Sequence, residues 1–306
     1  MSAQIEHAVA LLRAGELIGL PTETVYGLAG AARQAEAIAK IFALKQRPAS
    51  HPLIVHLHDP AQMDDWARDI SPLARDLAAR YWPGPLTLVL RRQANVLDAL
   101  TGGQDTIALR VPAHPIALGV LKAFADGVAA PSANRYQRVS PTTAEHVRAE
   151  FGSALKLVLD GGPSEVGIES SIVDLSGERP RILRLGMLHA HDFGRLAAHS
   201  DIRVPGSDAR HYAPEHPTAL IAAEHWIAHL QSLTLSGTRF ASLAYQPAPG
   251  ALQALEASSD ALEYAQALYA NLHVLSGLDV DLIAIEAPPE SPEWAAINDR
   301  LRRASG

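Results

Sequence analysis

Apolar residues in the first two thirds of the chain recur with two different spacings. Ile5, Ala8, Val9 and Leu12 follow the three- and four-residue steps that line one face of a helix. Shorter apolar runs that end at Gly or Pro instead indicate buried strands. The pattern predicts helices over 5–12, 35–44, 60–66, 72–81 and 116–124, and strands over 17–20, 53–57, 86–90, 106–111, 128–130, 155–159, 171–173 and 181–185.

The composition changes from about residue 190. Residues 199–217 include Pro205-Gly206 and His211-Tyr212-Ala213-Pro214 and are predicted to form an extended linker. Beyond it, strands over 219–222, 240–244 and 282–285 alternate with helices over 223–230, 261–275 and 294–304. We therefore expect an α/β (mixed α+β) chain with three parts. These are an open, twisted, mixed sheet flanked by helices over 1–198, the linker 199–217, and a small three-layer α/β (Rossmann-like) domain over 218–306.

Polar side chains follow two of the predicted strands. Thr22, Glu23 and Thr24 come after strand 17–20, and Ser132 and Asn134 come after strand 128–130. Ligands of open α/β sheets tend to bind outside the carboxyl ends of the strands. The alternative is that these residues are ordinary turn and capping residues. Gly27 is expected to allow a tight turn, and Ser140-Pro141-Thr142-Thr143 is expected to cap the next helix.

Two cations stand just past the helix predicted over 35–44. Lys45 and Arg47 could simply complement the helix dipole and remain in water. Pro48 and Pro52 restrain the loop, however, and a restrained Lys–Arg pair suits a polyphosphate, with Lys as a point charge and Arg as a planar fork.

Arg110 and His56 are polar residues within apolar strands. A buried arginine needs an anionic partner, which is either an internal carboxylate or the carboxylate of a ligand. His56 and His58 should face opposite sides of the sheet, so they do not by themselves predict a metal site. Arg181 is interpreted as a solvated charge.

The composition narrows the class of protein. The 306 residues are 48% hydrophobic and 19% charged, as in globular domains, and suggest one large or two ordinary domains. The absence of cysteine excludes disulfides and thiolate metal sites and is compatible with a reducing compartment.

We see neither a signal peptide nor an apolar run of about 18 residues, so the expected location is cytoplasmic, without membrane contact. A net charge of −7 argues against a broad nucleic-acid surface but leaves a small cationic site open.

Several common catalytic motifs do not occur. The sequence has no GxxxxGK[ST], GxGxxG, HExxH or GxSxG. The candidate groups are hydroxyls, amides and cations, and no nucleophile with its base stands out. This inventory favours binding, orientation and charge neutralisation over covalent catalysis.

Seven short blocks in a fixed order carry a family resemblance. They are residues 17–28, 45–48, 52–56, 106–112, 130–134, 169–174 and 182–184. The series resembles the YrdC/Sua-type threonylcarbamoyl-AMP synthases over residues 5–190 and, more weakly, over the remainder. Residues 205–206 and 211–214 resemble the linker of the longer, two-domain branch. The resemblance implies a YrdC-like sheet and a linker that crosses the active site.

The resemblance also implies a reaction. Members of this family are nucleotidyltransferases that condense L-threonine, bicarbonate or CO₂, and ATP, with Mg²⁺ accompanying the ATP. The products are L-threonylcarbamoyladenylate and pyrophosphate. A downstream transferase then passes the threonylcarbamoyl group to tRNA, at the adenosine beside the anticodon. Weak direct contact with RNA remains open.

Family positions can be carried over to individual residues. The implied catalytic residues are Lys45, Arg47, Ser132 and Asn134. The implied L-threonine contacts are Thr22, His56, Arg110, Ser132 and Ser170. The implied ATP contacts are Lys45, Arg47, His51, Thr106, Asn134, Ser140, Arg184 and Tyr212. No protein side chain is assigned to a metal.

Some positions depart from the family pattern, and two other functions stay open. His51 replaces a usual Asn, Ser171 a commoner Thr, and Leu185 a usual Pro, which leaves local nucleotide contacts uncertain. A non-catalytic double-stranded RNA-binding module of the same fold is disfavoured by the acidic charge. A carbamoyl-handling domain of a larger maturation enzyme is disfavoured because the acylphosphatase and Cys-rich zinc segments are missing.

Overall fold

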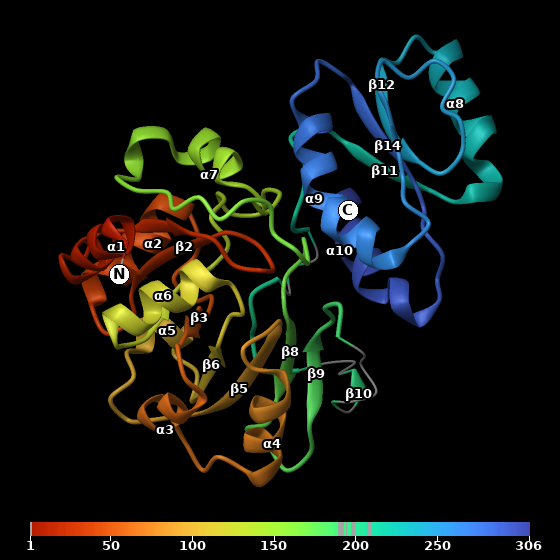
Figure 1. Ribbon diagram of the computed structural model, residues 1–306. Helices are drawn as coiled ribbons and strands as arrows, with labels where there is room; N and C mark the ends of the chain where they lie inside the picture. The colour runs from red at the N-terminus through yellow and green to blue at the C-terminus, as the bar shows by residue number, and fades with distance from the viewer. Residues whose placement is uncertain (1, 189–192, 194, 197–199, 207, 209) are drawn as a thin grey trace. The chain divides into compact units, whose positions relative to one another are not determined.

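The computed structural model describes residues 2–188, 193, 195–196, 200–206, 208 and 210–306 (Figure 1). The chain divides into two compact units. The first comprises residues 1–136 and 141–207, and the second comprises residues 137–140 and 208–306. The second unit thus includes residues 137–140, which the sequence placed within 1–198, and the predicted linker 199–217 is divided between the two units.

The first unit is built on a mixed sheet. Its order among the described residues is β1 (Ile18–Leu20), β2 (Gly27–Ala31), β7 (Val128–Ala129), β3 (Ile54–His56), β6 (Thr106–Arg110), β5 (Leu86–Arg92), β8 (Ser171–Asp174), β9 (Arg181–Arg184) and β10 (Arg195–Leu196), with β4 (Ala67–Arg68) beside β5. The pairs β3/β6, β5/β8 and β9/β10 are parallel, and the other described pairs are antiparallel. The mixed sheet predicted from the sequence is confirmed.

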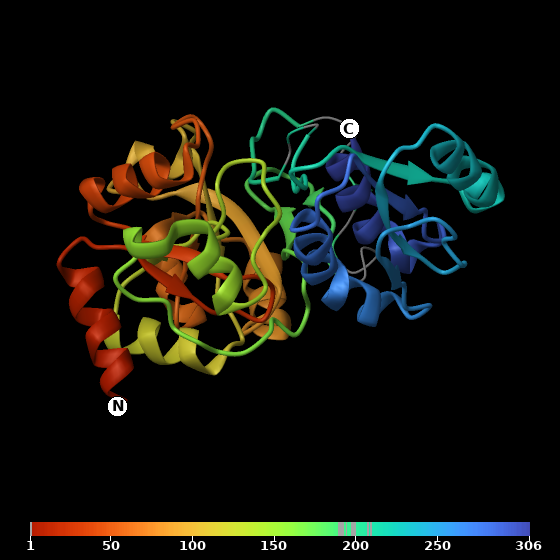
Figure 2. The ribbon, with the colours of Figure 1, turned by 90° about the horizontal axis from the view of Figure 1, so that it is seen from above.

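Helices α1 (Ala3–Arg13) and α6 (Pro115–Phe124) lie side by side over one part of this sheet (Figures 1 and 2). Leu12 and Leu121 pack there with Leu20 in one hydrophobic cluster. Successive strand residues point to opposite faces, so Leu28 belongs to a second cluster while its neighbour Ala29 belongs to the first. The two clusters place the sheet between layers of helices.

The other main helices of the first unit pack in the second cluster. Those are α2 (Ala35–Lys45), α4 (Pro72–Tyr81) and α7 (Ala144–Phe151); the shorter ones are η1 (Pro60–Gln62), α3 (Met63–Trp66), α5 (Asp98–Thr101) and η2 (Gly152–Ala154). Thr143, the last residue of the predicted capping segment, caps α7 by accepting a hydrogen bond from the backbone N of His146. Trp82 is buried in this cluster, and its indole Nε1 donates to the Leu86 carbonyl at 2.7 Å.

The polar stretch after β1 contains Thr22, Glu23 and Thr24. It joins β1 to β2 in an antiparallel pair, so it is a connection between two strands. Gly27 opens β2 and is needed for close approach, because a Cβ there would lie 3.0 Å from the Ala130 Cβ. The predicted tight turn at Gly27 is therefore wrong, and β2 itself was not predicted.

Two other predictions in the first unit are corrected. Residues 155–159 form no regular strand, and only Val158 makes an isolated bridge, to Gly19. The apolar side chains that suggested a strand are buried by packing in the two clusters. Arg181 is also not a free solvated charge. Its Nη2 lies 2.6 Å from Oδ2 of the fully buried Asp174, which needs a cation because a lone buried carboxylate is costly.

The second unit is a three-layer α/β domain, as predicted. Its four described strands are all parallel, in the order β11 (Thr218–Ile221), β14 (Leu282–Glu286), β12 (Phe240–Ala244) and β13 (Ala254–Glu256). The helical segments are η4 (Ala223–His225), α8 (Trp226–Leu235), α9 (Ala261–Ser276), η5 (Pro292–Trp294) and α10 (Ala295–Ser305). Helix α8 packs on one face through Trp226 and Leu230, and α9 and α10 lie on the other face (Figure 1).

None of the helices formed by the described residues is long and apolar enough to cross a membrane.

Candidate functional site

Lys45 is a buried ammonium group held by two backbone carbonyls. It is the last residue of α2, and Gln46 then turns the chain with a left-handed φ of 54°. The Lys45 Nζ donates to the carbonyl oxygens of Ser132 and Asn134, each at 2.5 Å, and the residue is 2% exposed. Among the described residues, no carboxylate forms an ion pair with Lys45. Burial, and then the nearby charge of Arg47, hold the pKa of Lys45 well below its usual value.

The loop after Lys45 is restrained, as its prolines suggested. Arg47 is buried, and its Nη2 donates to the Pro52 carbonyl at 3.0 Å. The His51 ring meets the Tyr136 ring edge-on, with 5.5 Å between ring centroids, and the Tyr136 backbone N donates to the Lys45 carbonyl. The Asn134 Nδ2 donates to the carbonyl of Arg135 at 2.7 Å. The structure therefore brings Lys45 together with Ser132 and Asn134, two segments that are distant in sequence.

Arg110 stands at the carboxyl end of β6 in a buried polar cluster. Its Nη2 lies 2.7 Å from Oε1 of Glu23, its Nη1 donates to Thr24 Oγ1 at 2.9 Å, and its Nε donates to the Gly84 carbonyl at 3.1 Å. Of the two alternatives left open by the sequence, the internal salt bridge is present. Glu23 is a site residue that the sequence did not assign. A signal existed, because Glu23 follows a strand end and a buried Arg needs an anion.

Thr22 and His56 adjoin the Arg110 cluster. Thr22 Oγ1 donates to the Val25 carbonyl at 2.6 Å and lies 3.0 Å from Thr24 Oγ1. His56 is directly opposite Arg110 in the parallel pairing of β3 with β6. Burial, and then the positive charge of Arg110, lower the pKa of His56 to about 3, so this imidazole is neutral at physiological pH. Its Nδ1 is buried without a hydrogen-bond partner.

A third cluster joins Ser170 to Arg184. Ser170 Oγ lies 2.7 Å from Thr87 Oγ1 and accepts a hydrogen bond from Arg184 Nη2 at 3.0 Å. The Arg184 Nε also donates to the Ser170 carbonyl at 3.0 Å, and its Nη1 donates to the Pro205 carbonyl at 3.1 Å. Thr87 was not singled out from the sequence, since a threonine in an apolar strand carries no distinctive signal.

Three other predicted nucleotide contacts are outside these clusters: Thr106 in the first unit, and Ser140 and Tyr212 in the second. Thr106 begins β6 and Arg110 ends it, so their Cα atoms are about 13 Å apart along the strand. Ser140 and Tyr212 belong to the second unit. There the Tyr212 ring stacks on Tyr269 at 5.7 Å, and the carbonyl of Ser140 lies 3.1 Å from Nε2 of His273.

The chemistry offered by the first unit is that of an anion site next to an ion pair. Lys45, Arg47, Arg110 and Arg184 are buried cations of the first unit, which also buries hydroxyl and amide side chains. Within the described ranges, no group of three or more His, Cys, Asp or Glu residues could hold a metal ion. Such a set binds and orients anionic ligands by charge and hydrogen bonds.

Comparison with known proteins was made by sequence and by structure. A family model named for Sua5, YciO and YrdC and described as telomere recombination matches residues 10–186. A second model, described as threonylcarbamoyl-AMP synthase, C-terminal domain, matches residues 176–306. The two matches together span both units.

Full-length relatives carry the same name. The threonylcarbamoyl-AMP synthase of Pyrococcus abyssi is 35% identical, over 99% of this chain and 94% of that protein. The Bacillus subtilis enzyme is also 35% identical, over 99% of this chain and 93% of that protein. The crystal structure of P. abyssi Sua5 complexed with L-threonine matches with a TM-score of 0.92 and 34% identity, covering 99% of this chain and 94% of that one. The chain therefore belongs to the Sua5/YrdC family of threonylcarbamoyl-AMP synthases, in its two-domain form.

Proposed function

We propose that the protein is a nucleotidyltransferase that condenses L-threonine, bicarbonate or CO₂, and ATP. The products are L-threonylcarbamoyladenylate and pyrophosphate. Family membership supports the reaction, and a relative of this chain has been crystallised with L-threonine. The observation that carries the proposal is the buried Lys45 ammonium, which two carbonyls hold but no described carboxylate neutralises. A buried cation of this kind is greatly stabilised when an anion such as a phosphate arrives.

ATP would bind on the Lys45 side of the first unit. Lys45 and Arg47 offset the charge of the triphosphate and of the departing pyrophosphate, and Ser132 and Asn134 supply short polar contacts. The further nucleotide contacts that we propose from the family pattern are His51, Thr106, Ser140, Arg184 and Tyr212. Mg²⁺ would enter as part of the nucleotide substrate, held by the phosphates, since no described cluster of protein ligands is available for it.

L-threonine would bind at the Arg110–Glu23 pair. A free amino acid is a zwitterion, and this pair presents a guanidinium for its carboxylate and a carboxylate for its amino group. The Glu23 Oε2 is buried and makes no hydrogen bond with the described residues, so it is available to an amine. Thr22, His56, Ser132 and Ser170 would surround the rest of the substrate. Polar contacts to the threonine hydroxyl would reject analogues that lack it.

The chemistry needs positioning more than a protein nucleophile. The threonine ammonium first loses a proton, and the resulting amine attacks the carbon of bicarbonate or CO₂ to give a carbamate. One water is released from bicarbonate, whereas with CO₂ the nitrogen loses one more proton. A carbamate oxygen then attacks the α-phosphorus of ATP, and the bond to the β-phosphate oxygen breaks to release pyrophosphate. Each step joins anions, and holding them in register with their charge offset can contribute roughly 7–11 kcal/mol.

The product would serve tRNA modification. An activated threonylcarbamoyl group needs an acceptor, and we propose that a downstream transferase delivers it to tRNA at the adenosine beside the anticodon. This step rests on the family relationship rather than on a feature of the site.

The proposal is tested by pyrophosphate release from ATP, with threonine and bicarbonate omitted in turn. We expect release to require both. RNA binding without any turnover would instead favour the non-catalytic module, and release that needs neither substrate would contradict the condensation. Lys45→Ala is expected to weaken the use of ATP. Arg110→Ala is expected to abolish the pyrophosphate release that depends on threonine.

A further inference from the structure

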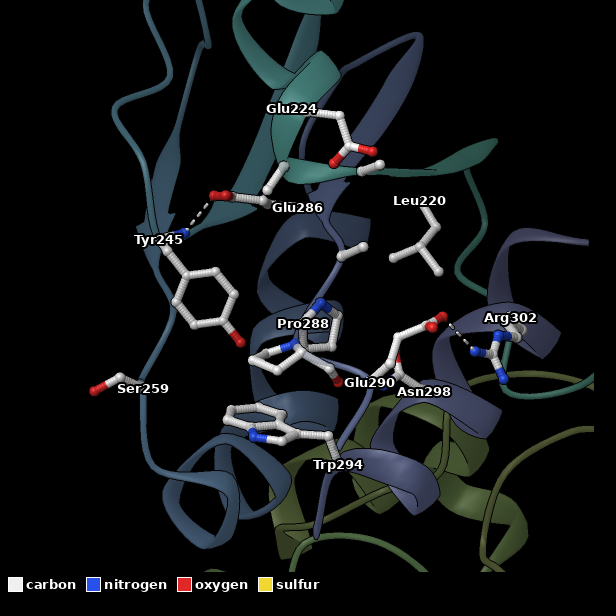
Figure 3. Close-up of a pocket in the computed structure, with 14 residues that line it drawn as sticks. Leu220, Glu224, Tyr245, Ser259, Glu286, Pro288, Glu290, Trp294, Asn298 and Arg302 are labelled. Atoms are coloured by element: carbon white, nitrogen blue, oxygen red, sulfur yellow. Dashed lines mark hydrogen bonds and ion pairs between the residues drawn. The ribbon is translucent and has the colours of Figure 1, made fainter. Parts of the chain in front are cut away.

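The second unit has a pocket at the carboxyl ends of its parallel strands (Figure 3). The cavity measures about 640 Å³, within the range of small-molecule sites. The pocket opens at the ends of β11 and β14, which are adjacent in the sheet. Helix α8 follows β11 and helix α10 follows β14, and these two helices lie on opposite faces of the sheet. This crevice is the position at which open α/β sheets generally bind ligands.

The charged side chains that line this pocket are mainly acidic. Glu224, Glu286 and Glu290 contribute carboxylates, and Arg302 is the guanidinium among the lining residues. Arg302 Nη2 lies 3.3 Å from Oε1 of Glu290 (Figure 3). Among the residues that line the pocket, Glu224 and Glu286 therefore have no paired cation. Two net negative charges disfavour a phosphate, the usual ligand at such a crevice, and favour a cation.

Glu286 is built into the pocket wall. Its Oε2 accepts hydrogen bonds from the backbone N atoms of Tyr245 and Gln246, at 2.8 and 2.9 Å, and its Oε1 accepts one from Gln246 Nε2 at 2.7 Å. A carboxylate has about four acceptor positions, so Glu286 can still accept from a ligand. These hydrogen bonds also hold the backbone in place at Tyr245 and Gln246.

Aromatic rings form the apolar side of the pocket. The Tyr245 phenol and the Trp294 indole lie on the same side, both next to Pro288, with 6.3 Å between ring centroids (Figure 3). Tyr264 packs behind them, 6.1 Å from Tyr245 and 5.4 Å from Trp294. The Tyr245 hydroxyl is buried and has no hydrogen-bond partner in the part of the chain that the structure describes. Burial and the Glu286 carboxylate raise the pKa of Tyr245, so its hydroxyl stays protonated and can donate to a ligand.

We propose that this pocket binds a small organic cation, an amine attached to a flat apolar body. The amine would contact Glu224 and Glu286, and the body would lie against Tyr245 and Trp294, whose ring faces also attract cations. The proposal does not depend on the synthase reaction, because all lining residues belong to the second unit and binding can be measured without ATP.

The test is calorimetric titration of the full-length protein with two matched probes. Tyramine carries an amine on a phenol ring, and 4-hydroxyphenylacetate carries a carboxylate on the same ring. We expect one saturable site for tyramine and at least about tenfold weaker binding of the acid, which corresponds to about 1.4 kcal/mol. Equal binding of the two probes, or no saturable binding of tyramine, would overturn the proposal.

Three variants locate the site. Glu224→Gln should weaken tyramine binding about fivefold, whereas Glu293→Gln, an exposed acid outside the lining, should leave it unchanged. Arg302→Ala should tighten binding at least about twofold, since it removes a like charge and releases Glu290. A gain in affinity cannot result from misfolding. Unchanged affinity in both Glu224→Gln and Arg302→Ala would place the tyramine elsewhere and refute the assignment.

Discussion

Arg110 Nη2 lies 2.7 Å from Oε1 of Glu23, and both side chains are at most 5% exposed. Separating such a buried pair leaves an uncompensated charge and typically costs 3–5 kcal/mol. The pair also combines one positive and one negative side chain, the charges complementary to those of an amino-acid zwitterion. We infer that the substrate binds to this ion pair as a whole, with Glu23 as a binding residue beside Arg110.

Removing the Glu23 charge should therefore impair threonine binding selectively. Glu23→Gln keeps the size of the side chain but loses the negative charge that would contact the amino group. We expect threonine affinity to fall about tenfold or more, with ATP affinity within about twofold of wild type. Titration calorimetry with each substrate measures both. Glu36→Gln, an exposed acid in the first turn of α2, serves as the matched control. Unchanged or tighter threonine binding in Glu23→Gln would contradict this role.

Nucleotide binding should depend on pH through Lys45. In the free protein, burial and Arg47 depress the pKa of Lys45, whereas a bound phosphate would raise it. ATP binding should therefore take up a proton, and ATP affinity should decline as pH rises and the free ammonium deprotonates. The guanidinium of Lys45→Arg stays charged, so this variant should have a flatter pH profile, whatever its absolute affinity. Identical pH slopes in Lys45→Arg and the wild type, over the pH range in which both stay folded, would exclude Lys45 as the titrating group.

His56 should make the fold sensitive to acid. Its pKa is about 3 in the folded protein and 6.5 as a free side chain, so the unfolded chain binds the proton first as pH falls. The stability contribution is fully present above pH 6.5 and is lost toward pH 3, at up to about 1.4 kcal/mol per pH unit. Urea unfolding at several pH values measures this slope.

Two variants isolate the His56 contribution. His56→Asn should lose less stability between pH 7 and about 5 than wild type, even if its stability at pH 7 is lower. The exposed His7→Asn should follow the wild-type curve. A His56→Asn slope equal to that of wild type would mean that this histidine is not held neutral by the fold.

Helices and strands could be predicted from the sequence where their apolar residues follow a clear periodic spacing. Helices α1, α2, α4 and α6 bury apolar faces with helical spacing, and each was predicted to within a few residues. Strand β2 reads GLAGA, which has neither β-branched residues nor alternation, and it forms because it pairs between β1 and β7. Strand β13 has three residues, two of them exposed, so it too lacked a pattern.

Contacts between candidate residues could be expected where a local segment carried its own chemistry. Lys45 could be related to Ser132 and Asn134 through the family blocks, and their hydrogen bonds confirm that these segments meet. Glu23 was noted after a strand but not assigned to a ligand, and Thr87 was not noted, because their significance depends on partners brought close by the sheet. The Arg110–Glu23 pair forms only when β6 lies beside the β1–β2 connection, a long-range relationship that spacing does not encode.

The identity of the product tests the central claim most directly. The protein should be incubated with ATP, L-threonine and ¹³C-labelled bicarbonate, and the nucleotides should be separated for mass spectrometry. We predict an adenylate that contains one threonine and one labelled carbon, formed in step with pyrophosphate and absent with Arg110→Ala. An adenylate without the label, or ATP hydrolysis to AMP without any threonine adduct, would contradict the condensation.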